Sequence, residues 1–137
     1  MPQSSPVGNG AGTARKVGRV LDTSPLNAAV ERFADRLRAA PQSRLQRGAA
    51  AEALELAREL AQRAQRLEDP QGAAPARVMP DAGLFTVGDQ VAVAGLDLAE
   101  ALRAAVPAAG PEGAKAPSEM LDEAVALVER AEVRAMR

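Results

Sequence analysis

The chain contains no cysteine, histidine, tryptophan, tyrosine or isoleucine, and only two phenylalanines, Phe33 and Phe85. Without cysteine, neither a disulfide nor thiolate chemistry is available, and without histidine the usual zinc sites and the Glu-x-x-His di-iron sites of helical bundles are excluded. A serine nucleophile would have to rely on Lys16 or Lys115, which both lie in expected loops. The glycine-rich loops of nucleotide enzymes are missing too. We therefore expect no catalytic residue, no metal and no cofactor, and a small enzyme or ligand carrier is the third alternative for the function.

The charge balance gives the chain no strong preference for an anionic partner. Seventeen basic residues face eighteen acidic ones, for a net charge of −1, so there is no overall attraction to nucleic acid or to a membrane surface. The first twenty residues hold no apolar run typical of a signal peptide, and no 18-residue apolar span occurs. We expect a cytoplasmic protein without membrane contact, and the bias toward alanine and arginine is typical of high-GC bacteria.

Large apolar side chains are scarce. Hydrophobic residues make up 47% of the chain, but half of these are alanine. Alanine has little surface to bury, whereas a buried leucine or valine contributes about 1.5–3 kcal/mol. The core is therefore expected to be thin, and a protein partner or a homo-oligomer, such as a dimer, would supply the missing burial.

Apolar residues recur with helical periodicity in four segments, and serine or threonine stands near the start of each as an expected N-cap. The helices are predicted near 24–40, 43–68, 87–105 and 118–135, with caps at Ser24, Ser43, Thr86 and Ser118. The fold class is thus all-α, either a small bundle of three to four helices or a pair of helical hairpins.

The remaining segments are rich in proline, glycine or serine. Residues 70–83 and 107–117 are predicted to be linkers, and residues 1–19 a disordered basic tail that precedes a helical domain at 20–137.

The stretch from Leu84 to Val93 allows two interpretations. A Gly88-Asp89 turn between valine-rich flanks is typical of a β-hairpin. However, Val87, Val91 and the following apolar residues repeat at helical spacing without a break at that turn, and a two-stranded hairpin alone is marginal in water. We favour the helix.

The function that these patterns favour is a non-catalytic helical interaction protein, which self-associates or docks on a partner through alanine, leucine and valine faces with coiled-coil-like spacing. The expected interaction face consists of Leu45, Leu56, Leu60, Leu67, Val87, Val91, Leu98 and Leu102. The alternative is a DNA-associated regulator that contacts phosphate through basic residues of the tail and of the start of the second helix. Those residues are Arg15, Lys16, Arg19, Arg44 and Arg47.

Overall fold

The computed structural model describes residues 21–105 and 115–137, and the long segments within these ranges are helical. The predicted tail at 1–19, with Arg15, Lys16 and Arg19, and most of the predicted linker at 107–117 lie outside the described residues. The elements are α2 (Ser24–Ala39), α3 (Gln42–Arg44), η1 (Leu45–Ala49), α4 (Ala50–Glu68), η2 (Leu84–Thr86), α5 (Val87–Ala105) and α6 (Pro117–Ala135). The all-α prediction is confirmed.

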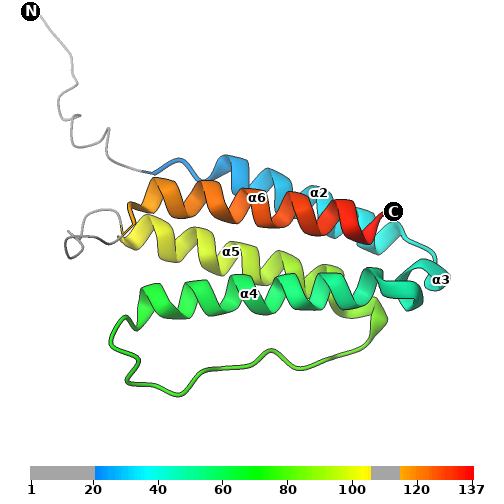
Figure 1. The fold of residues 1–137 in the computed structure, drawn as a ribbon, viewed down its shortest axis with the longest axis horizontal. Coiled ribbons are helices and arrows are strands. Elements are labelled where there is room, and N and C mark those ends of the chain that lie inside the picture. Colours follow the sequence, from blue (N-terminus) through cyan, green and yellow to red (C-terminus); the bar gives the residue numbers. More distant parts are fainter. Residues whose placement is uncertain (1–20, 106–114) are drawn as a thin grey trace, which may run out of the picture.

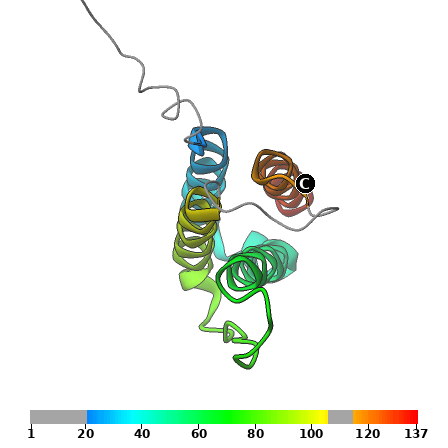
Figure 2. The same cartoon turned by 90° about the vertical axis from the view of Figure 1, so that its left-hand side faces the viewer.

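The four long helices α2, α4, α5 and α6 form a bundle (Figures 1 and 2). α5 lies between α2 and α4 and makes its most extensive contacts with α4, and α6 closes the bundle against α2 and α4. α2 and α4, although consecutive, make few direct contacts. The bundle, rather than a pair of hairpins, is therefore the arrangement that this chain adopts.

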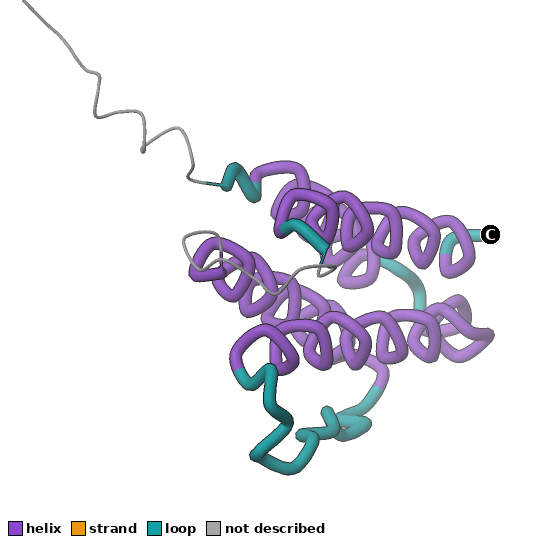
Figure 3. Tube along the Cα trace, turned by 60° about the vertical axis from the view of Figure 1, so that its left-hand side comes forward, coloured by secondary structure: helices purple, strands orange, loops and turns teal. Residues whose placement is uncertain are grey.

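The helices do not alternate in direction. α4 and α5 run parallel to one another, and α2 and α6 run the opposite way (Figure 1). Parallel neighbours require a long return connection, which residues 69–83 supply by running back along the bundle (Figures 1 and 3). We call residues 69–83 the strap.

Side chains of α4 hold the strap by its main chain. The amide of Gln65 donates to the Pro75 carbonyl at 2.9 Å and accepts from the Arg77 N–H at 3.0 Å. Arg58 Nε donates to the Met79 carbonyl at 2.8 Å. Gln90 of α5 donates to the Pro80 carbonyl at 2.9 Å, so side chains of two helices satisfy part of the main chain of this irregular segment.

The segment from Leu84 to Val93 is helical, as favoured from its periodicity, with a short 3₁₀ turn before α5. The predicted cap at Thr86 is wrong in detail, because its hydroxyl donates to the Gly83 carbonyl at 2.9 Å. Ser24 and Ser118 do not cap either. The structure gives α2 and α6 no side-chain N-cap bond, and instead Glu119 accepts from the Ala116 N–H at 3.1 Å.

The predicted helix at 43–68 is interrupted at Gly48. Its φ of 140° and ψ of −18° are not helical, and the wide turn η1 precedes α4 there. Only glycine adopts this positive φ without strain. Gly48 therefore lowers the helix propensity of the segment, but it also allows the chain to change direction between α3 and α4.

The core is built largely from alanine and leucine. The largest fully buried side chains are Phe33, Leu26, Leu60, Leu98, Leu102, Val91 and Val128. Small residues let the helices approach closely, and two glycines of α5 face α2. A Cβ at Gly95 would lie 2.7 Å from the methyl groups of Val30, and one at Gly88 would lie 3.1 Å from the Ala34 carbonyl oxygen.

Candidate interaction surface

The residues predicted as an interaction face lie in the core of the single chain. Leu45, Leu56, Leu60, Val87, Val91, Leu98 and Leu102 are all buried, and Leu67 is partly buried against the same cluster. Their stripes pack against one another, which is the intramolecular outcome that the same periodicity allows. A surface for a partner must therefore be sought among the apolar side chains that the bundle leaves exposed.

Three of those side chains gather along α5 and the turn that leads into it. Phe85 is 74% exposed, Val93 55% and Leu96 54%. Val93 and Leu96 are three residues apart and so share one helix face, and Phe85 lies in the 3₁₀ turn that leads into the same helix. We call Phe85, Val93 and Leu96 the α5 strip.

Acidic side chains border the α5 strip. Asp97 and Glu100 are exposed, and neither forms an ion pair with any described residue. Asp89, one turn before Val93, accepts from Arg38 of α2 at 2.7 Å. The surface around the strip therefore combines apolar side chains with uncompensated negative charge.

Arg44 and Arg47, the predicted nucleic-acid contacts within the described chain, lie at the end of the bundle where α3 and η1 meet the end of α6. They line a cleft of about 250 Å³ together with Gly48, Glu52, Arg134 and Arg137. The periodicity of the second helix indicated nothing of this grouping, because Arg134 and Arg137 are about ninety positions away in the sequence. The start of α2, where the predicted basic tail would join, lies at the opposite end of the bundle (Figure 1).

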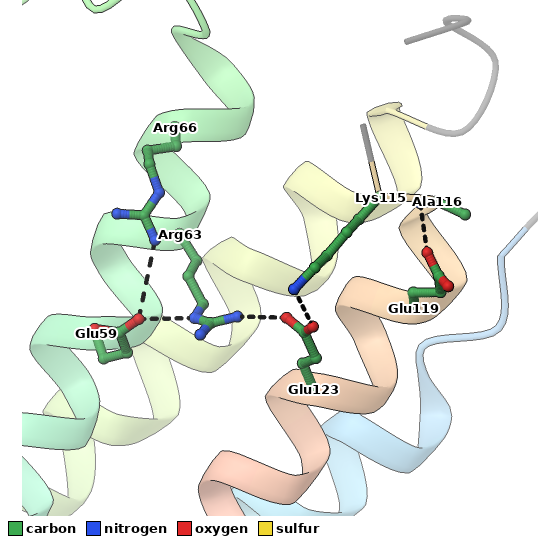
Figure 4. A network of polar contacts seen from close by, with 7 residues as sticks. All are labelled: Glu59, Arg63, Arg66, Lys115, Ala116, Glu119 and Glu123. Carbon is green, nitrogen blue, oxygen red and sulfur yellow. Dashed lines mark hydrogen bonds and ion pairs between the residues drawn. The ribbon is translucent and has the colours of Figure 1, made fainter. Parts of the chain in front are cut away.

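That opposite end carries a network of ion pairs. Arg63 of α4 bridges Glu59 at 2.8 Å and Glu123 of α6 at 3.2 Å, and Lys115 also binds Glu123 (Figure 4). The hydrogen bonds from Lys115 and Arg63 lower the pKa of the Glu123 carboxyl. The network fixes α6 to α4 and compensates the charges it contains.

The acidic residues of α6 do not converge on a metal site. Glu119 binds a main-chain N–H, Glu123 binds two basic side chains, and Asp122 and Glu129 are exposed. Across residues 21–105 and 115–137, no group of three or more acidic side chains is placed to hold an ion. No helix of the described chain is long and apolar enough to cross a membrane.

Glu132 is a charged residue that continues the helical stripe of Leu121, Val125 and Val128 along α6. It is 7% exposed, and its two carboxylate oxygens each lie 3.2 Å from a guanidinium Nε of α2, one from Arg32 and one from Arg36. The contact with Arg32 is a hydrogen bond, whereas that with Arg36 lacks hydrogen-bond geometry. The position of Glu132 in the stripe was the signal that it faces a neighbouring helix.

Comparison with known proteins finds no family model, no curated protein and no solved structure that matches this chain.

Proposed function

We propose that the protein is a non-catalytic interaction module of the cytoplasm, whose α5 strip docks on an apolar helix face of a partner protein that carries basic residues at its edges. The proposal moves the interaction surface from the buried stripes to the outer face of α5. It keeps the class of function that the composition favours.

The exposure of Phe85 is the observation that carries this proposal. The chain has two phenylalanines; Phe33 is 0% exposed and Phe85 is 74% exposed. Burial of such a side chain contributes about 1.5–3 kcal/mol, and buried aromatic anchors are typical of the energetic centre of protein interfaces. Large apolar side chains are scarce in this chain, and yet Phe85 is exposed to solvent. A partner protein that covers Phe85 best explains this exposure.

The charges around the strip favour a basic partner. Asp97 and Glu100 border the strip without an ion partner among the described residues. Charges at the rim of an interface chiefly set the orientation and the rate of association, and like charges there exclude wrong partners. A partner helix with arginine or lysine beside its apolar stripe satisfies both requirements.

Site-specific photo-crosslinking in the native cell tests the proposal. A photoreactive amino acid at Val93 should give a defined covalent adduct with a protein partner. The matched control is Val78, which is 69% exposed but lies on the strap and not on the α5 strip. Equal adducts at the two positions, or none at Val93, would contradict the proposal.

Size-exclusion chromatography with light scattering then identifies whether the partner is a second copy. The chain itself offers an exposed Val133 beside Arg130 and Arg134 on α6, so self-association has a complementary surface available. If it occurs, Val93→Glu should shift the mass toward that of the monomer, and Val78→Glu should not.

The DNA-associated alternative keeps one supporting observation, the grouping of Arg44 and Arg47 with other arginines. Glu52, Glu55 and Glu59 follow on α4. Glu52 and Glu59 are paired with arginines, whereas the exposed Glu55 would repel the phosphate backbone. Absence of retention on DNA at low salt would end this alternative.

A further inference from the structure

The cleft lined by Arg44, Arg47, Gly48, Glu52, Arg134 and Arg137 gathers an excess of positive charge. Four of the lining side chains are guanidinium groups and one is a carboxylate. Arg134 is paired with that carboxylate, with Nε 2.9 Å from Glu52 Oε1. Arg44, Arg47 and Arg137 form no ion pair with a carboxylate side chain of the described chain. We call this set the arginine cleft.

Two contacts between elements hold the arginine cleft in shape. Arg44 Nη1 donates to the main-chain oxygen of Arg137 at 3.1 Å, which joins α3 to the end of α6. The pair between Arg134 and Glu52 joins α6 to α4. Arg44 and Arg134, which are fixed in this way, lose little freedom when a ligand binds, and this favours affinity.

The main chain at Gly48 leaves room in the same cleft. A Cβ built on Gly48 would meet nothing within 4 Å, and its φ of 140° keeps the position open to glycine alone. Gly48, which changes the direction of the second helix, therefore also leaves its main chain accessible to a ligand in the cleft.

Gathering several guanidinium groups is unfavourable unless an anion compensates them, and the planar guanidinium matches the oxygens of phosphate in two parallel hydrogen bonds. The cleft of about 250 Å³ is below the common range of about 300–1,000 Å³ for pockets that enclose drug-sized ligands. It suits a phosphate group better than a whole nucleotide. We propose that the arginine cleft binds the phosphate group of a small phosphorylated molecule, or free phosphate.

The α5 strip does not line this cleft, so the inference is independent of the proposed protein interaction. Each proposal can fail while the other holds. The two tests also use different residues.

Titration of the full chain with inorganic phosphate and with pyrophosphate, followed by ¹H–¹⁵N spectra, tests the inference. We expect saturable shifts at the amides of Arg47 and Gly48, with chloride at equal ionic strength giving none. Arg47→Gln should weaken phosphate binding by ~10-fold or more, because the variant loses charge-assisted hydrogen bonds to the phosphate oxygens. Arg66→Gln, an exposed arginine near the other end of α4, is the matched control and should bind as the wild type does.

Further arms separate binding of a phosphate group from binding of nucleic acid and from nonspecific binding of anions. A short DNA duplex that binds through Arg47 while inorganic phosphate and pyrophosphate do not would overturn the inference. Equal shifts in phosphate and chloride, or equal weakening in Arg47→Gln and Arg66→Gln, would overturn it as well. Arg137→Gln, a second change at the cleft, should reproduce the loss, and circular dichroism checks that each variant is folded.

Discussion

Two glycines inside α5 set how closely that helix approaches α2. From helix propensity alone, Gly88 and Gly95 are weak points, since glycine costs about 1 kcal/mol relative to alanine in a helix interior. The packing reverses this interpretation at Gly95, where an added Cβ would overlap the branched side chain of Val30. A residue that is unfavourable for one helix is therefore required by the contact between two.

Gly95→Ala is expected to destabilise the protein by about 1 kcal/mol or more, because overpacking costs about 1–3 kcal/mol and exceeds the gain in helix propensity. Urea unfolding measures the change. In a Val30→Ala background the same substitution should cost less, or even stabilise, because the opposing methyl groups are gone. An identical effect in both backgrounds would show that the contact does not decide the outcome.

At the scale of elements, the strap is held by side chains rather than by secondary structure. Gln65 alone makes two hydrogen bonds to its main chain. Such a segment should open locally without unfolding the bundle, since it has few apolar contacts of its own.

Gln65→Ala should therefore speed tryptic cleavage after Arg77 while leaving the melting temperature nearly unchanged. Each lost hydrogen bond is worth about 1 kcal/mol for the closed strap. Gln62→Ala, an exposed glutamine on the same helix, serves as the control. If both variants were cleaved at the wild-type rate, Gln65 would not be the anchor.

Acidification should loosen the first residues of the strap. The Asp69 carboxylate accepts from the N–H groups of Ala74 at 2.8 Å and Ala73 at 3.2 Å, and these bonds lower the pKa of Asp69 below the ordinary aspartate value of about 3.9. The stabilisation that these two hydrogen bonds give to the start of the strap is thus present above that value, and it is lost as the pH falls through the lowered pKa of Asp69. The amide signals of Ala73 and Ala74 should titrate in that range, and Asp69→Asn should abolish the titration.

Helix positions could be predicted from the sequence because the apolar periodicity that indicates a helix and the prolines that end one are both local features of the sequence. The predicted segment 87–105 matches α5, and 118–135 differs from α6 by one residue. The break at Gly48 was missed, since a lone glycine reads equally well as a weak point inside a helix. Caps at Ser24 and Ser118 were wrong because neighbouring carboxylates at Asp22 and Glu119 bind the main chain instead.

At the scale of the whole molecule, the pairing of helices could not be predicted in the same way. The strap is long enough to join either parallel or antiparallel neighbours, so nothing local decides that α4 and α5 run together. The arginine cleft joins α3 to α6, and the buried Glu132 joins α6 to α2. For the same reason, the eight predicted interface residues could not be distinguished from core until their partners within the chain were known.

α6, like α2, has less extensive contacts than α4 and α5, and Glu132 joins it to α2. Glu132→Ala should destabilise the protein by about 1 kcal/mol, since the half-exposed arginines partly regain water. Glu129→Ala, an exposed change on the same helix, should have little effect. Hydrogen exchange should show α6 less protected than α4 and α5, with the difference enlarged in Glu132→Ala alone.

The contact between the first and last described helices also has a consequence for synthesis. Arg32 and Glu132 are separated by a hundred positions, so the flank of α2 that faces α6 stays uncovered while the intervening chain is translated. At about 5–20 residues per second, this interval lasts roughly 5–20 s. A nascent chain on the ribosome therefore presents a flank of α2 that the finished protein covers, and a chaperone has that interval in which to bind it.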